Sequence, residues 1–193
     1  MTVEQPVPQP APRARGPKTV GDMVRSLGLV LGAVVVLLLI TFRPQGQAVH
    51  VVDYRATLAQ ARIGSAFPLL APVGLPSGWQ ATSAYFDGPQ GGSSAGVPGV
   101  TSWHVGFIAP GDKYAGFEQT NGIAIGTLHD VLGDPTQTGG TADVGGVTWE
   151  RWTDGAGDRR ALVRTDGGVT VVVDGSADWP VLEALAGSLR TGT

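Results

Sequence analysis

Residues 147–174 read VTWERWTDGAGDRRALVRTDGGVTVVVD, and this stretch decides the fold of the chain. It contains three runs rich in β-branched and aromatic residues, at 147–152, 159–165 and 169–174. The linkers between them, DGAGD at 154–158 and DGG at 166–168, combine aspartate with glycine, as tight hairpin turns do. The stretch therefore predicts a meander of three antiparallel strands.

Alternation along these strands assigns their side chains to two faces. Val169, Val171 and Val173 share one side of the third strand, and we expect that side, with Ala161 and Val163 of the middle strand, to be core. The opposite face then combines a tryptophan with two arginines, residue types that are enriched in binding hot spots. We predict a candidate binding surface there, made of Glu150, Trp152, Arg160, Leu162 and Arg164, with Val172 beside them.

An alternative for this face is that another part of the chain covers it. The N-terminal half or the proline-rich passage at 68–76 would then bury Trp152, and the arginine stems would only cover sheet surface. Trp149 lies three residues earlier, so we expect it on the core side of the same strand.

The chain after residue 53 adds strands and helices around the meander. Further strands are predicted at 79–86, 101–109 and 114–120, and helices at 53–61, at 123–132 and after Asp178. The segment GPQGGSSAGVPG at 88–99 is too rich in glycine to be anything but a loop. This pattern predicts an α+β domain, with an antiparallel sheet and helices packed on one face.

Residues 26–42 read SLGLVLGAVVVLLLITF and carry no charge. With Met23 and Val24 the apolar run approaches about 20 residues, enough for a helix to cross roughly 30 Å of hydrocarbon. We therefore predict a transmembrane helix at 23–42 whose partner is the lipid bilayer. The alternatives are a buried globular helix and a signal peptide cleaved after Gly46-Gln47-Ala48, but the run exceeds the roughly 7–15 residues of a signal-peptide core.

Basic residues orient this segment. Four of them precede the uncharged stretch and only Arg43 follows it closely, so the positive-inside rule places the N-terminus in the cytoplasm. Residues 1–22 are predicted to be a disordered, proline-rich tail, residues 43–52 a linker, and residues 53–190 an extracytoplasmic domain. The expected location is the cell membrane, with a single span and the C-terminal domain outside.

Charge and cysteine content exclude several function classes. The net charge of −3 divides into +3 up to Arg43 and −6 beyond it, so the outer domain is a poor nucleic-acid binder and is repelled by anionic lipid. The chain has no cysteine, which excludes disulfides, thiolate metal sites and cysteine nucleophiles.

Isolated motifs point to no catalytic, cofactor or metal site. Ser94 is the centre of a G-x-S-x-G match at 92–96, but a strand follows it where a nucleophile elbow requires a helix. The histidines His50, His104 and His129 have no metal-ligand spacing. We expect His104 to point away from the core face of its strand and to be solvated or locally bonded.

Acidic pairs are equally uninformative in the sequence. Asp154 with Asp158, and Asp130 with Asp134, lack the ligand spacing of a calcium loop and suit turns and helix ends. Paired carboxylates contributed by distant strands cannot be recognised from spacing alone.

Four segments carry a resemblance to a known family: LPSGW at 75–79, SWHVGF at 102–107, YAGFEQ at 114–119 and VTVVVDG at 169–175. Placed behind one N-terminal anchor, they resemble the domain-of-unknown-function 4245 family of membrane-anchored actinobacterial proteins. The resemblance covers about residues 20–190 and implies a location and an anchor. It implies no activity and no catalytic residues.

Our leading functional prediction is a non-catalytic binding or accessory module of the cell envelope that meets an envelope protein or ligand through its sheet. The alternative is a cell-envelope hydrolase with an acid-based active site. A sensor that signals inward is a weaker third class, because the predicted tail contains no domain. The enzyme requires convergent titratable groups in a concave pocket, whereas the binding module requires an apolar patch with few such groups.

Overall fold

The computed structural model describes residues 20–41, 50–89 and 98–191. It divides the chain into two compact units, Met1–Gln47 and Ala48–Thr193, each described here by itself. The first unit contains helix α1 (Val20–Thr41). Within the described residues, no helix combines the length and apolar character that a membrane crossing needs. Most of the predicted tail, the last residue of the predicted span and most of the linker lie outside the described ranges.

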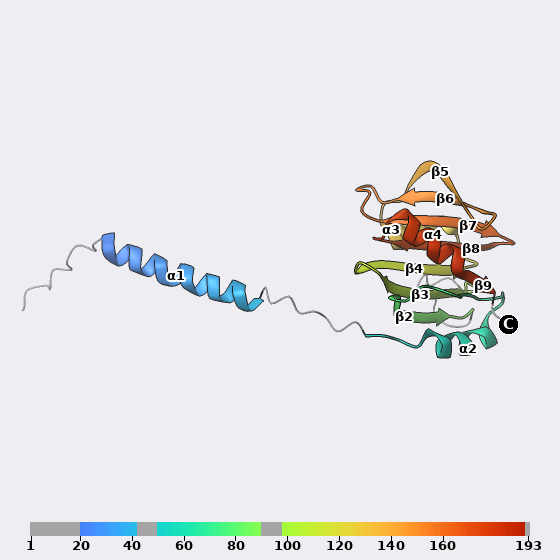
Figure 1. Cartoon of the computed structure of the whole chain (residues 1–193), viewed down its shortest axis with the longest axis horizontal. Helices are drawn as coiled ribbons and strands as arrows, with labels where there is room; N and C mark the ends of the chain where they lie inside the picture. The colour runs from blue at the N-terminus through green and yellow to red at the C-terminus, as the bar shows by residue number, and fades with distance from the viewer. Residues whose placement is uncertain (1–19, 42–49, 90–97, 192–193) are drawn as a thin grey trace, which may run out of the picture. The chain divides into compact units, whose positions relative to one another are not determined.

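The second unit is built on a seven-stranded antiparallel sheet (Figure 1). Its strand order is β2-β3-β4-β8-β7-β6-β5, and a separate pair, β1 with β9, forms a small second sheet. The strands are β1 (Leu70–Pro72), β2 (Gln80–Asp87), β3 (Ser102–Ala109), β4 (Lys113–Thr120), β5 (Thr136–Val144), β6 (Val147–Thr153), β7 (Arg160–Asp166), β8 (Val169–Gly175) and β9 (Leu189–Thr191). The predicted α+β class and the predicted meander, which is β6-β7-β8, are confirmed.

Three helices accompany the sheet: α2 (Tyr54–Gly64), α3 (Ala124–Leu132) and α4 (Trp179–Ser188). Each lies where the sequence predicts a helix. The Asp53 side chain caps α2 by accepting a hydrogen bond of 3.1 Å from the Arg55 backbone N–H. Sequence reasoning missed three strands, the short β1 and β9 and the longer β5. Strand β5 was missed because TQTGGTADV is short of apolar residues and occupies an edge of the sheet.

The helices cover both faces of the sheet, so the prediction that they pack on one face is wrong. The larger core cluster joins Leu58 of α2 and Leu182 of α4 to the strand face that carries Val173. The smaller cluster joins Leu128 of α3 to the other face, next to Val172. We call these the α4 face and the α3 face. Apolar residues occur on both, which is why simple alternation did not identify a single core side.

The register of the meander corrects the predicted faces of its middle strand. Leu162 lies opposite Val173, and Val163 lies opposite Val172, so Leu162 belongs to the α4 face and Val163 to the α3 face. The cause is the two-residue turn Gly167-Gly168, in which both residues have positive φ, 57° and 79°. A turn of that length pairs Asp166 with Val169 and fixes every later pair.

Candidate functional site

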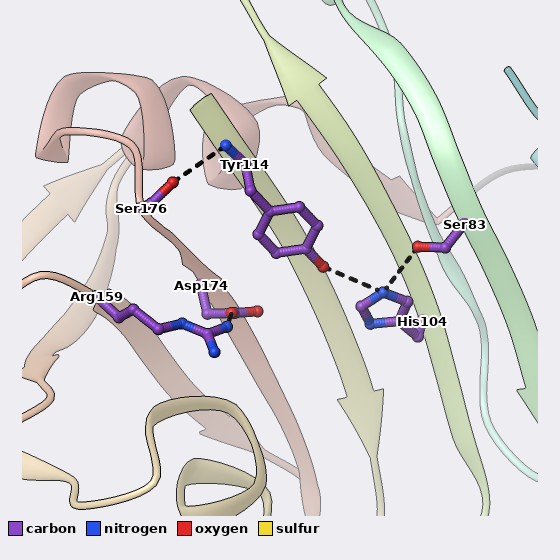
Figure 2. Close-up of polar contacts among 6 residues, drawn as sticks. All are labelled: Ser83, His104, Tyr114, Arg159, Asp174 and Ser176. Atoms are coloured by element: carbon purple, nitrogen blue, oxygen red, sulfur yellow. Dashed lines mark hydrogen bonds and ion pairs between the residues drawn. The ribbon is translucent and has the colours of Figure 1, made fainter. Parts of the chain in front are cut away.

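A cluster of polar side chains occupies the α3 face of strands β2, β3, β4 and β8. Alternation brings them to one side, because His104 lies opposite Tyr85 on one neighbouring strand and opposite Glu118 on the other. On β8, Asp174 lies opposite Gly116 of β4. We call this set the polar cluster: Ser83, Tyr85, His104, Tyr114, Glu118, Arg159 and Asp174. Figure 2 shows most of its members and the contacts between them.

Two glycines make room for the central ring of the cluster. A Cβ atom at Gly116 would lie 2.5 Å from the Tyr114 hydroxyl, and one at Gly106 would lie 2.9 Å from it. The Tyr114 ring can therefore lie across these two positions of neighbouring strands, and its hydroxyl reaches 3.4 Å from Nε2 of His104 (Figure 2). The Ser176 hydroxyl accepts a hydrogen bond of 3.3 Å from the Tyr114 backbone N–H and holds this end of the strand.

His104 is buried, with 8% of its surface exposed. Its Nε2 atom contacts the hydroxyls of Ser83 at 3.3 Å and Tyr114 at 3.4 Å, and its ring stacks on Tyr85 at a centroid distance of 4.6 Å. Burial lowers the pKa of His104 to about 4, so the ring is neutral at pH 7. Its Nδ1 atom is buried and has no partner among the described residues. His104 points away from the Trp103 face of its strand, as predicted, and it is locally bonded and not solvated.

Asp174 is the most buried acid of the cluster, with 1% of its surface exposed. Its Oδ2 atom accepts a hydrogen bond of 2.9 Å from Nη2 of Arg159, while its buried Oδ1 atom has no partner among the described residues. Burial raises the pKa of Asp174 to about 6, even though the Arg159 charge and its hydrogen bond act in the opposite direction.

Glu118 lies diagonally across from Asp174 on the neighbouring strand. Burial, followed by the negative charge of Asp174, raises the pKa of Glu118 to about 7. None of the ion pairs formed by the described residues includes Glu118. The tyrosines remain protonated, because burial raises the pKa of Tyr85 to about 12 and also raises that of Tyr114. Perturbed acids, a neutral imidazole and two phenols thus meet on one face, as they do in functional sites.

The arrangement contains hydrogen-bond acceptors as well as donors. The Glu118 carboxyl, Oδ1 of Asp174 and one ring nitrogen of neutral His104 can accept hydrogen bonds, and Arg159 is the basic member of the cluster. In the part of the chain that the structure describes, no three metal-ligating side chains come together. The chemistry available here is proton transfer and the binding of a hydrogen-bond donor.

The sheet register divides the candidate surface predicted from the sequence. Glu150 and Trp152 lie on the α3 face, where they line a cavity of about 330 Å³ beside α3, and Arg164 is also among the residues that line this cavity. Their side chains are bonded to each other, with Nε1 of Trp152 donating to Oε2 of Glu150 at 3.2 Å. The other three residues, Arg160, Leu162 and Arg164, lie on the α4 face. The five do not form one surface.

The separated residues have distinct environments. Leu162 is fully buried in the core, and Arg160 approaches the exposed Asp178 carboxylate at 3.9 Å. Arg164 lies over the indole of Trp149 at 5.1 Å, and Trp149 is buried as predicted. Ser94 lies outside the described residues, while His129 bonds the carbonyl of Gly133 at the end of α3.

Sequence reasoning singled out His104 without assigning it a functional role, and it missed Tyr85, Tyr114, Glu118 and Asp174. The signal was present as polar residues or glycine at every second position of three strands, for example Tyr114, Gly116 and Glu118 on β4. This signal could be recognised only with the strand order, because β8 lies next to β4 in the sheet although β5, β6 and β7 separate them along the chain.

Fold and cluster together define an α+β domain in which one antiparallel sheet lies between helices and carries a buried polar cluster on its α3 face. The chain belongs to the family described as protein of unknown function (DUF4245), which matches residues 15–189. That match confirms the family, and the family description names neither an activity nor a membrane anchor. The comparison with curated proteins gives no match.

Proposed function

We propose that this chain is a membrane-anchored, extracytoplasmic binding module of the cell envelope, and that the polar cluster is its ligand site. The support for the anchor is the sequence, in which residues 26–42 carry no charge and four basic residues precede them. Binding is favoured over a purely structural role by one observation: buried polar atoms of His104 and Asp174 have no partner among the described residues.

The charge of the cluster selects the class of ligand. Glu118 and Asp174 bring two carboxyl groups to one face, and among the described residues only Arg159 forms an ion pair with either of them. A ligand that donates hydrogen bonds would satisfy Oδ1 of Asp174, and a protonated amine would also offset the Glu118 charge. Tyr85, which is 41% exposed, adds an aromatic ring at the edge of the cluster. The proposed ligand is therefore an amine-bearing, hydroxylated molecule.

Two amino sugars that differ in one group test this proposal. We expect glucosamine to bind the full-length protein in detergent and N-acetylglucosamine to bind at least tenfold more weakly, by calorimetry or ligand-observed NMR. Glu118→Gln should remove the preference, whereas Glu150→Gln, on the same face but outside the cluster, should keep it. Between pH 6 and 7, where Glu118 ionises and the glucosamine amine is still largely protonated, binding of the amine should strengthen as pH rises. Absence of glucosamine binding, or binding unaffected by Glu118→Gln, would contradict the ligand class.

The anchor and its orientation are tested separately. Protease added to intact cells should degrade the C-terminal domain and leave the N-terminal tail protected. A mature chain that begins near Val49 would instead identify residues 23–42 as part of a cleaved signal peptide.

A cell-envelope hydrolase is the second candidate, and one observation favours it. The pKa of Glu118 is about 7 and that of Asp174 about 6, so a protonated and an ionised carboxyl can coexist near neutral pH. That is the condition for paired general acid and general base catalysis. The test is hydrolysis of cell-wall glycan. Activity in the wild type that is lost in both Glu118→Gln and Asp174→Asn, while both variants stay folded, would favour the enzyme over the binding module.

A further inference from the structure

On the α4 face, away from the polar cluster, Arg164 differs from the other arginines of the meander. Arg151 pairs with Glu183 at 2.6 Å, Arg159 with Asp174 at 2.9 Å, and Arg160 with Asp178 at 3.9 Å. Among the described residues, the Arg164 guanidinium has neither a carboxylate partner nor a hydrogen bond, and its Nε atom is buried. A partly buried cation without a counter-ion is costly unless a ligand or water completes it.

The guanidinium of Arg164 is held by stacking and not by charge. Its Cζ atom lies 5.1 Å from the ring centroid of Trp149, which is itself 2% exposed. Stacking on an indole uses the face of the guanidinium and leaves its N–H edge available for a planar acceptor. Arg164 is therefore held in place before any ligand arrives.

A cavity of about 310 Å³ adjoins this guanidinium. Its walls include Val144, Trp149, Ala186 and Leu189. Of the described residues that line it, Arg164 and Arg190 are basic and none is acidic. Arg190 is fixed there because its Nη1 atom donates to the carbonyls of Gly187 at 2.8 Å and Leu189 at 2.7 Å. Arg164 also lines a smaller cavity of about 180 Å³ together with Asp166, and the cavity of about 330 Å³ together with Glu150. It forms an ion pair with neither acid.

We propose that this cavity, the Arg164 cavity, binds an organic carboxylate. A carboxylate matches the fork of a guanidinium with two parallel hydrogen bonds, and the apolar walls take the carbon skeleton attached to it. The volume is at the low end of small-molecule sites, so it suits a group the size of a short aliphatic or aromatic acid. The carboxylate belongs to a free small acid or to the C-terminus of a peptide. This site is independent of the polar cluster, which lies on the other face of the sheet.

The probes are benzoate, its neutral analogue benzamide, and inorganic phosphate, each titrated calorimetrically into the full-length protein in detergent. We expect one equivalent of benzoate to bind, benzamide to bind at least tenfold more weakly, and phosphate not to compete. Equal binding of benzoate and benzamide would overturn the proposal, as would a complete lack of benzoate binding. Phosphate that binds as tightly as benzoate would identify a simple anion site and would equally overturn it.

Variants locate the site. Arg164→Gln should weaken benzoate at least tenfold, and Arg164→Lys should weaken it less, because lysine keeps the charge but loses the fork. Arg160→Gln is the matched control, since Arg160 is two alternating positions away on the same strand, and benzoate binding should stay within twofold of wild type. Unchanged binding in Arg164→Gln would refute the assignment. Should that variant fail to fold, Arg190→Gln, with an expected loss of severalfold, replaces it.

A second pair of probes identifies the source of the carboxylate. A short acetylated peptide with a free C-terminus is compared with its C-terminal amide. Preference for the free peptide over benzoate would indicate that the cavity captures a chain end. Tighter binding of benzoate would indicate a free small acid. Both results support the Arg164 cavity, whereas a peptide amide that binds as well as the free acid would contradict it.

Discussion

Replacing Glu118 by glutamine should make the folded protein more stable at alkaline pH than the wild type. Glu118 has its pKa raised from 4.5 to about 7 by burial and by the Asp174 charge. A carboxyl with a higher pKa in the folded than in the unfolded state binds more protons when folded, so it destabilises the fold as pH rises from 4.5 to 7. Below 4.5 both states are protonated and the penalty is absent; above 7 it is complete.

The magnitude follows from the size of the shift. One pKa unit corresponds to about 1.4 kcal/mol, which gives about 3 kcal/mol for the shift of Glu118. Because part of the side chain meets solvent, we expect the gain of Glu118→Gln over wild type to be about 2–3 kcal/mol at pH 8. At pH 4 the two proteins should agree within about 0.5 kcal/mol, since a protonated carboxyl and an amide are both neutral.

The contribution of Glu118 is measured by the difference in unfolding free energy between Glu118→Gln and the wild type. The pKa of His104 is lowered to about 4, so its contribution to stability falls as pH drops from 6.5 to 4, opposite in sign to that of Glu118. Urea unfolding of the full-length protein in detergent, followed by tryptophan fluorescence, measures both curves, because every tryptophan lies after residue 48. The exposed Glu150→Gln variant should show no such pH-dependent gain. A Glu118→Gln gain that is the same at pH 4 and pH 8 would refute the reasoning.

Further mutations test the packing on both sides of the sheet. Gly175→Ala should destabilise the fold by about 3 kcal/mol or more, because the new Cβ atom would collide with the backbone carbonyl of Tyr114. Gly126→Ala in α3, where the new methyl meets nothing, should instead raise stability by about 0.5–1 kcal/mol in urea unfolding. Trp149→Ala should lower the free energy of unfolding by about 3–5 kcal/mol. Trp152 is only partly buried, so Trp152→Ala should lower it roughly half as much, as measured by thermal unfolding of both variants. Equal large losses for both tryptophans would mean that Trp152 is covered as completely as Trp149.

Local patterns were sufficient for most elements of the outer domain. Aspartate-glycine turns gave the β6-β7-β8 meander, and Asp53 and Asp178 marked the starts of α2 and α4. These signals are short in range, because a turn or a cap involves residues within a few positions of each other. Sequence reasoning missed strand β5 because the strand is rich in glycine and threonine and pairs with β6 alone, at the edge of the sheet.

The functional residues depended on contacts that are distant in sequence. Tyr85, His104, Glu118 and Asp174 come from four strands, and β8 reaches β4 only after three other strands have formed the far side of the sheet. The predicted binding surface combined residues of both faces for the same reason, because assigning Leu162 and Val163 to faces needs the register of the whole sheet. A one-residue error in register moves every side chain of a strand to the other face.

The sequence by itself determined the α+β class, the turns, the helix starts, the family and the uncharged stretch at 26–42. Only the tertiary structure decided which polar groups meet, which of them lose water, and which remain without a partner. The physical reason is that pairing and burial depend on neighbours in space. Residues far away along the chain raise the pKa of Glu118 to about 7, and they surround Arg164 with one cavity whose described lining contains no acidic side chain.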